Sequence, residues 1–285
     1  MLLSVLRNTR GKRHDSICEI KFSLVFPDSA SLITSWPGPG MSRGYDTQTT
    51  TFSPDGRIFQ IEYAIEAIAH APPAVALVLG KDAAPGVLIA TVKAQRHSLV
   101  DTTKSAAEKT LRITDDIVCC AAGLVSDANI LVAHARNIAQ KHLGTYNCPI
   151  AFETLVREVC DVKQFYTQHG GLRPYGVSFL WAGWDEREGF QLFRSDPSGN
   201  YSEWLATSIG GNEAAAASIL KQEYPTLEKE GGVAAGELTL EHAEKIAKNS
   251  LEKATEGTAL LCDSTEMALL VRKGGKTHIS LIAQQ

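Results

Sequence analysis

The stretch Thr49–Ala67, TTTFSPDGRIFQIEYAIEA, decides how the chain is interpreted. Its three threonines, at 49–51, are of interest because threonine can act as a protease nucleophile when a free amine lies beside its hydroxyl. These threonines are internal, however, and Gln48 precedes them instead of the small glycine that favours self-processing. The stretch is therefore expected to connect a tail to a helix, and an active threonine hydrolase is the alternative.

The second part of this stretch predicts a turn followed by a helix. Ser53-Pro54-Asp55-Gly56 has turn chemistry, because proline fixes φ and Asp and Gly suit the later turn positions. Pro72-Pro73 then stops helical hydrogen bonding, since proline lacks an amide donor. Apolar residues recur at helical spacing between them, at Ile58, Ile61, Ile65 and Ile68. We therefore expect a helix over residues 58–70.

The composition is that of a globular protein with a substantial core. Hydrophobic residues make up 44% of the 285 residues and charged residues 21%. The formal net charge of −4 provides no global positive field that would attract nucleic acid or anionic lipid. No run approaches the ~18 apolar residues that span a bilayer. Neither nucleic acid nor a membrane is expected as a partner.

Cysteines and histidines give no sign of a metal site. The six cysteines contain no C-x-x-C pair, so buried free thiols in a reducing compartment are expected. His134 and His142 lie eight residues apart and have no glutamate at the spacing of a zinc-protease motif. They are expected at the surface or its rim. The sequence predicts no metal and no cofactor.

The first forty residues differ from the rest of the chain. The segment 1–14 contains four basic residues and no acid, and the breaker-rich segment 36–40 precedes Met41. Residues 1–40 are expected to be an extension, either disordered or an artefact of the start site. A transit peptide that delivers an organellar binding protein is the alternative. The folded domain is expected at 41–285.

The remaining pattern alternates groups of strands with pairs of helices. Short apolar runs bounded by turn residues predict the strands, and apolar stripes predict the helices. Ser126 is expected to cap the second helix. The predicted strands are 74–79, 87–92, 117–122, 176–184, 190–194, 201–209, 267–271 and 278–283. The predicted helices after the first begin at 126 and after Pro149, and then cover 213–224 and 240–254. This order favours two stacked sheets covered by helices on both outer sides.

Several motifs resemble those of proteasome α subunits. The N-terminal signature of that family is matched by Tyr45-Asp46, by Thr50–Arg57, by Gln60, by Glu62-Tyr63-Ala64 and by Glu66-Ala67. Further similarity lies at 123–128, in Tyr166-Thr167-Gln168, at 170–171, at 173–178 and at 183–185. The resemblance covers nearly everything from Met41 to about Ile282.

The resemblance implies an α+β fold, the four-layer αββα sandwich of the N-terminal-nucleophile hydrolase type. A gate tail (41–57) and a signature helix (58–70) would precede the sandwich (74–285). It also implies a noncatalytic subunit of the 20S core particle in the cytoplasm and nucleus. Its expected partners are other α subunits in a seven-membered ring, β subunits of the adjacent ring, and C-terminal tails of regulatory ATPases or other activators.

The resemblance also implies two functional sites, each assigned to the residues of this chain that match the family's motif. Tyr45, Asp46, Pro54 and Tyr63 match the cluster that holds the tails in the open-pore arrangement, and helix and turn packing is the simpler alternative. Lys109 matches the lysine that receives the carboxylate of an activator tail, and a solvated lysine is the simpler alternative.

Overall fold

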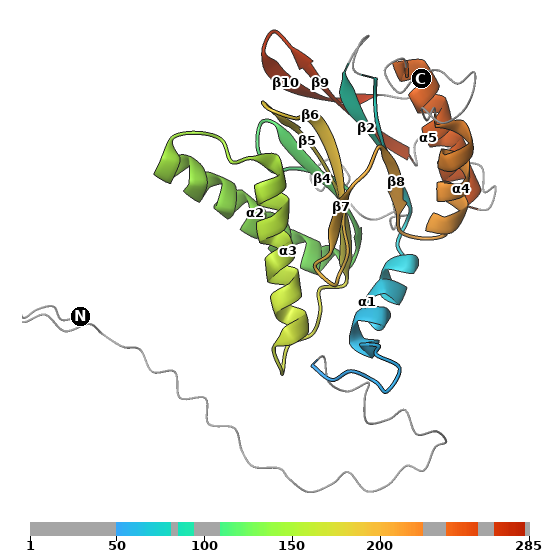
Figure 1. Ribbon diagram of the computed structural model, residues 1–285. Helices are drawn as coiled ribbons and strands as arrows, with labels where there is room; N and C mark the ends of the chain where they lie inside the picture. Colours follow the sequence, from blue (N-terminus) through green and yellow to red (C-terminus); the bar gives the residue numbers. More distant parts are fainter. Residues whose placement is uncertain (1–49, 81–84, 94–108, 225–237, 256–264, 283–285) are drawn as a thin grey trace, which may run out of the picture. The chain divides into compact units, whose positions relative to one another are not determined.

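The computed structural model describes residues 50–80, 85–93, 109–224, 238–255 and 265–282, all within one compact unit, Met41–Gln285 (Figure 1). The domain boundary expected at residue 40 and the segment before it lie outside the described residues. Within them, the helices are α1 (Phe59–Ala69), α2 (Val125–Tyr146), α3 (Phe152–Gln168), α4 (Glu213–Glu223) and α5 (Leu240–Ala254).

The described strands form two antiparallel sheets of five strands each. One sheet has the order β10-β9-β2-β1-β8, and the other has the order β3-β4-β5-β6-β7. The strands are β1 (Ala74–Val78), β2 (Gly86–Val92), β3 (Thr110–Arg112), β4 (Ile117–Gly123), β5 (Val177–Asp185), β6 (Gly189–Ser195), β7 (Tyr201–Glu203), β8 (Ala206–Ile209), β9 (Thr265–Lys273) and β10 (Lys276–Ile282).

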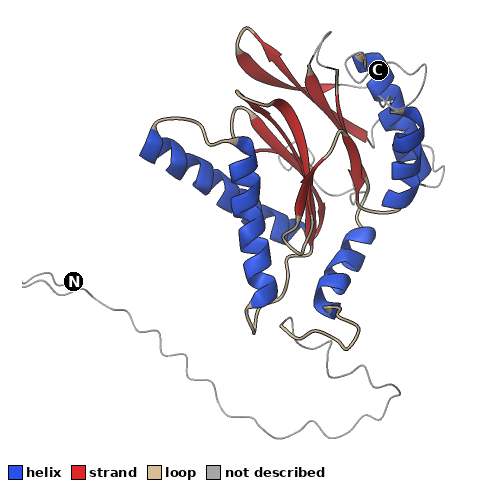
Figure 2. Ribbon diagram, viewed as in Figure 1, coloured by secondary structure: helices blue, strands red, loops and turns tan. Residues whose placement is uncertain are grey.

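The two sheets stack face to face, and a pair of helices covers the outer face of each (Figures 1 and 2). Three apolar clusters fill the spaces between these four layers. One cluster joins α2 and α3 to β4, β5 and β6, and another joins α4 and α5 to β1, β2 and β9. The third lies between the sheets and includes Ala74, Val118 and Leu180. The predicted αββα sandwich is confirmed.

The predicted strand 201–209 is wrong as a single element. Residues 201–203 pair with β6 in one sheet, whereas residues 206–209 pair with β1 in the other. The chain changes sheets at two neighbouring residues: the Trp204 amide donates to the Leu192 carbonyl (2.9 Å), and the Leu205 carbonyl accepts from Val78 (2.8 Å). Because both halves have strand composition, no local feature of the sequence marks this crossing.

Two smaller predictions also need correction. The cap at Ser126 is wrong, because α2 begins at Val125 and its N-cap residue is Leu124, which makes no side-chain cap hydrogen bond. The three-residue strand β3 was not predicted, because so short a segment shows no periodicity.

The cysteine prediction is confirmed at three positions and wrong at one. Cys119, Cys120 and Cys160 are buried free thiols, whereas Cys148 is exposed in the connection between α2 and α3. Cys18 and Cys262 lie outside the described residues. The part of the chain that the structure describes contains no helix that could cross a membrane and no group of side chains that could hold a metal ion.

Candidate functional site: the signature segment and Lys109

The turn before α1 is held by hydrogen bonds that converge on Ser53, whose side chain is buried. The Ser53 amide donates to the Arg57 carbonyl (2.9 Å), and the Ser53 carbonyl accepts from Gly56 (2.9 Å). The Arg57 amide donates to the Ser53 hydroxyl oxygen at 3.0 Å. Gly56 has φ 75°, in the left-handed region that glycine adopts without a Cβ clash. The predicted turn is confirmed, and it leaves Pro54 exposed at its tip.

An ion pair connects this turn to the first turn of α1. The guanidinium of Arg57 donates to both carboxylate oxygens of Glu62, each at 2.6 Å, and lies 5.6 Å from the centre of the Phe59 ring. The hydrogen bond to Glu62 raises the pKa of Arg57. A carboxylate near a helix N-terminus also complements the helix dipole. The pair fixes the orientation of the turn relative to the helix.

Helix α1 is apolar but barely buried within the subunit. Ile68 is its one buried residue, whereas Tyr63 and Ile65 are 52% and 50% exposed. The rings of Phe59 and Tyr63 stack with their centroids 6.4 Å apart. The apolar spacing predicted from the sequence is therefore present: among the isoleucines of this pattern Ile68 is buried, Ile58 and Ile61 are half-buried, and Ile65 is the exposed one.

Lys109 lies beyond the other end of this helix, at the connection between α1 and β1. Its ammonium donates a 2.7 Å hydrogen bond to the Pro72 carbonyl, and the side chain is half-buried. The same connection is fixed by hydrogen bonds from Val92 to Pro73 (3.1 Å) and from Gly211 to Ala71 (2.7 Å). Lys109 is thus a positioned cation, not a freely solvated one.

Burial lowers the pKa of Lys109, because desolvation penalises the ammonium. Cys120 and Glu266 act in the opposite direction. Of the other predicted site residues, Pro54 and Tyr63 are both exposed on the signature segment. Pro54 precedes the first turn of α1 and Tyr63 lies near the middle of the helix, whereas Lys109 lies beyond its last turn. Tyr45 and Asp46 lie outside the described residues.

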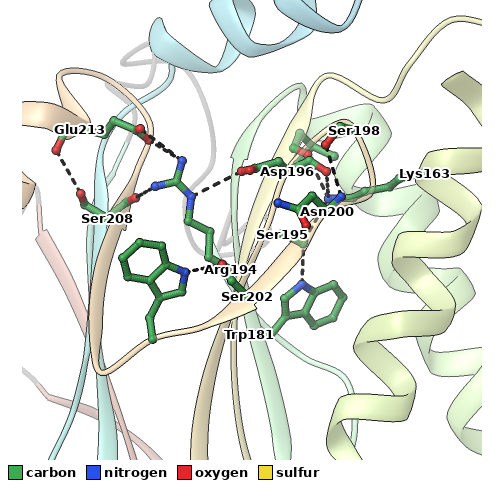
Figure 3. A network of polar contacts seen from close by, with 12 residues as sticks. Lys163, Trp181, Arg194, Ser195, Asp196, Ser198, Asn200, Ser202, Ser208 and Glu213 are labelled. Atoms are coloured by element: carbon green, nitrogen blue, oxygen red, sulfur yellow. Dashed lines mark hydrogen bonds and ion pairs between the residues drawn. The ribbon is translucent and has the colours of Figure 1, made fainter.

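A buried lysine on α3 was missed by the sequence analysis. The Lys163 ammonium donates to the Val177 carbonyl (3.2 Å), to the Ser195 hydroxyl (3.1 Å) and to the Asp196 carbonyl (3.4 Å), as Figure 3 shows in part. It also lies 4.8 Å from the centre of the Phe179 ring. Burial lowers its pKa to about 8. Its position on the apolar stripe of the predicted helix was the available signal.

The polar network around Lys163 continues across both sheets to α4 (Figure 3). Arg194, one residue before Ser195, donates to the Ser208 carbonyl on β8 at 3.1 Å. The same guanidinium pairs with Asp196 (3.4 Å) and with Glu213 at the start of α4 (3.0 Å). Side chains from α3, β6 and α4 are thereby joined through one continuous set of contacts.

An ion pair with a buried carboxylate joins two of the motif segments. Asp127 is buried in the first turn of α2 and accepts from Arg173 through both carboxylate oxygens, at 2.6 and 2.8 Å. It also accepts from the Gly176 amide at 3.1 Å. Hydrogen bonding to Arg173 holds the pKa of Asp127 below its usual range. The segments 123–128 and 170–178 are therefore held together by these hydrogen bonds.

The fold and the signature segment define a class of protein: an αββα sandwich whose first strand continues directly from a helix. Thr50 and Thr51 lie in the chain ahead of that helix, so neither starts a strand in the way that an N-terminal nucleophile requires. The model of the proteasome subunit family matches residues 77–270, and that of the N-terminal signature of A-type proteasome subunits matches residues 45–67. The chain belongs to the proteasome subunit family, as an α-type, noncatalytic structural subunit of the 20S core particle.

Named relatives agree with this assignment. The chain is 48% identical over 239 residues to proteasome subunit alpha type-4-2 of Oryza sativa subsp. indica, which covers 84% of this chain and 90% of the relative. It is 47% identical over 228 residues to proteasome subunit alpha type-4 of Spinacia oleracea, covering 80% and 85%. A probable proteasome subunit alpha type-3 of Schizosaccharomyces pombe is 45% identical over 239 residues, covering 84% and 90%. The threonine-hydrolase alternative is therefore wrong.

Proposed function

We propose that the chain occupies one position in the seven-membered α ring of the core particle. There it contacts other α subunits on either side and β subunits of the adjacent ring. The observation that carries this proposal is that two large apolar side chains of α1, Tyr63 and Ile65, are half-exposed on different sides of the helix within the described part of the chain. Exposed apolar side chains on more than one side favour protein partners, and a ring closes when each subunit uses two different patches.

The segment before α1 is proposed to act in the gate that restricts substrate entry. Pro54, at the exposed tip of the turn, and Tyr63, on the exposed face of α1, are both accessible to other chains. Tyr45 and Asp46 join them through the match to the N-terminal signature. The ion pair between Arg57 and Glu62 supports this role, because it gives the turn a fixed direction relative to the helix.

Lys109 is proposed to receive the C-terminal carboxylate of an activator tail, from a regulatory ATPase or another activator. An ammonium has more than one N–H, so it can keep its bond to Pro72 and still donate to a ligand. An accessible pair of this kind contributes only about 0–1 kcal/mol, so docking requires several such pockets acting together. The assembled particle is proposed to work in the cytoplasm and nucleus.

The ring-contact proposal is tested with Ile65→Asp, which places a carboxylate at a half-exposed apolar position of α1. A buried, unpaired carboxylate at a subunit interface costs at least about 1.4 kcal/mol, so incorporation into core particles should fall about tenfold or more. Native mass spectrometry of purified particles measures the incorporated fraction. The urea midpoint of the purified chain should stay unchanged, because Ile65 is half-exposed there.

A matched control is Leu281→Asp on β10, because Leu281 is 59% exposed and the new side chain is the same. Incorporation of Ile65→Asp at the level of the wild-type chain would remove the ring-contact role of α1. An equal loss in both variants would show that any added surface charge impairs assembly.

A further inference from the structure

A row of three residues crosses β1, β2 and β9 on the inner face of their sheet. Ala74 lies opposite Thr91 in the β1–β2 ladder, and Thr91 lies opposite Glu266 in the β2–β9 ladder. Residues directly opposite each other in an antiparallel pair point to the same face. Because Ala74 belongs to the cluster between the sheets, the side chains of Thr91 and Glu266 also face the second sheet.

The second sheet contributes polar groups from its edge. Thr110 on β3 lies opposite Cys120 on β4, and Cys120 belongs to the same cluster between the sheets. Lys109 directly precedes Thr110, and its ammonium reaches the Pro72 carbonyl, two residues before Ala74. We call Lys109, Thr91, Thr110, Cys120 and Glu266 the inter-sheet polar cluster.

Burial makes this cluster unusual. Thr91, Thr110 and Glu266 are each at most 9% exposed. The hydroxyl oxygens of Thr91 and Thr110 have no hydrogen-bond partner within the described part of the chain. An unsatisfied buried polar group costs about 1–3 kcal/mol, and a buried carboxylate is normally paired with a cation. Hydroxyls in such a place can solvate a charge that lies near them.

Lys109 is the basic group of the cluster; burial lowers its pKa, and Glu266 acts to raise that pKa, as a nearby carboxylate does. Burial raises the pKa of the Cys120 thiol to about 12, so this thiol is neutral at physiological pH. The titration of Cys120 responds to both Lys109 and Glu266, which puts all three groups within electrostatic range of one another. Among the described residues that act on Lys109, Cys120 and Glu266 are the titratable ones.

We propose that Glu266 is a positioning residue for Lys109: its carboxylate, together with the hydroxyls of Thr91 and Thr110, keeps the half-buried ammonium charged and directed towards the connection between α1 and β1. This inference rests on the proposed docking role of Lys109. Desolvation favours the neutral amine, which cannot form a charge-assisted hydrogen bond to a tail carboxylate. The anion on β9 opposes that desolvation.

The test uses assembled core particles that carry variants of this chain. Peptide hydrolysis is measured from pH 7 to 10 with a synthetic activator-tail peptide that ends in a free carboxylate, and is divided by unstimulated hydrolysis at each pH. Stimulation should be lost at alkaline pH as Lys109 loses its proton. Glu266→Gln should move the midpoint of this loss to lower pH by about half a unit or more, because a nearby negative charge is removed.

Matched variants distinguish a specific effect of the Glu266 carboxylate on Lys109 from a general effect of the substitution on the particle. Glu266→Asp keeps the charge and should restore the midpoint to within experimental error of wild type. Glu241→Gln makes the same chemical change at an exposed residue of α5 and should leave the midpoint in place. Glu266→Ser, a second neutral variant, decides the question if glutamine prevents assembly. An unmoved midpoint in the neutral variants would overturn the inference.

A second readout keeps this inference distinct from the docking proposal. If the tail peptide stimulates Lys109→Met particles as strongly as wild type, the docking role of Lys109 is wrong, but the effect of Glu266 on Lys109 is still testable. The pH dependence of Lys109 acetylation, measured by mass spectrometry in particles without the tail peptide, reports the charge of the amine directly. Glu266→Gln should make the amine reactive at lower pH than in wild type. Identical profiles would show that Glu266 does not act on Lys109.

Discussion

Lys163 and Lys109 are two lysines of the same subunit, and their surroundings differ in kind. Lys163 is fully buried, and its ammonium donates to two carbonyls and a hydroxyl. Lys109 is half-buried, and the hydrogen bond described for its ammonium goes to the Pro72 carbonyl. The first cation is enclosed and satisfied by its own chain, whereas the second keeps donors that another molecule can use.

This contrast separates a structural charge from a binding charge. Burying an ion costs several kcal/mol of folding free energy. Well-oriented hydrogen bonds to several acceptors offset that cost, but only while all of these acceptors are present. Lys163 joins α3 to the β6–β7 connection in this way. A binding cation needs the reverse arrangement, with enough solvation to stay charged and at least one direction left open.

The largest effect is expected for Lys163→Ala. The change removes three hydrogen bonds, leaves their acceptors buried and opens a cavity, so it should lower the free energy of unfolding by about 3–5 kcal/mol. Urea unfolding of the purified chain, followed by the fluorescence of buried Trp181, measures the loss. Lys248→Ala on the exposed side of α5 is the control and should change stability by less than about 0.5 kcal/mol. A loss below about 1 kcal/mol for Lys163→Ala would show that Lys163 is not a structural cation and would contradict the contrast with Lys109.

The pH dependence of stability gives an intermediate effect. The pKa of Lys163 is about 8 in the folded chain and 10.5 in its ordinary state, so between these values the unfolded chain holds a proton that the folded chain has lost. Stability therefore rises with pH in this window, by at most about 1.4 kcal/mol per pH unit. Below pH 8 both states are protonated and this contribution is constant.

Lys163→Met lacks the titrating group, so its stability should not show this rise. The measurement is the difference in unfolding free energy between wild type and Lys163→Met at pH 7.5, 9 and 10. A difference that stays constant over that range would contradict the assignment of Lys163 as a buried cation with a lowered pKa.

The smallest effect on stability is expected for Lys109→Met, which keeps the length of the side chain and removes its charge. Loss of the bond to Pro72 and of the positive charge near Glu266 is offset in part by relief of desolvation, so unfolding should become easier by about 1–2 kcal/mol, less than for Lys163→Ala. Stimulated peptide entry into assembled particles should nevertheless fall severalfold. A stability loss as large as that of Lys163→Ala would show that both lysines are structural.

Local patterns predicted most of the elements but few of their contacts. Apolar periodicity and Pro72-Pro73 located α1, and turn residues separated the strands of the first sheet. The same patterns missed the crossing between sheets at Trp204 and Leu205, because a strand keeps its composition on either side of such a crossing. They also placed a cap at Ser126, although the helix begins one residue earlier.

The candidate site shows the same division. Pro54, Tyr63 and Lys109 were identified from the sequence through their match to family motifs, and the structure describes all three. Glu266 was not identified, because it is separated from Lys109 by most of the chain and lies in a strand of ordinary apolar composition. The partners of Lys163 lie 14 to 33 residues further along the chain, and they were missed because two of the three acceptors are backbone carbonyls, which have no side-chain signal.

The sequence alone determined the layer order, the α-type signature and the internal position of the three threonines, because these depend on residues close together in the chain. The tertiary structure alone decided which lysine is enclosed, which is open, and that Tyr63 and Ile65 of α1 are half-exposed within the described part of the chain. Burial and charge pairing depend on side chains brought together from distant strands and helices. Apolar periodicity along the chain does not predict these long-range contacts.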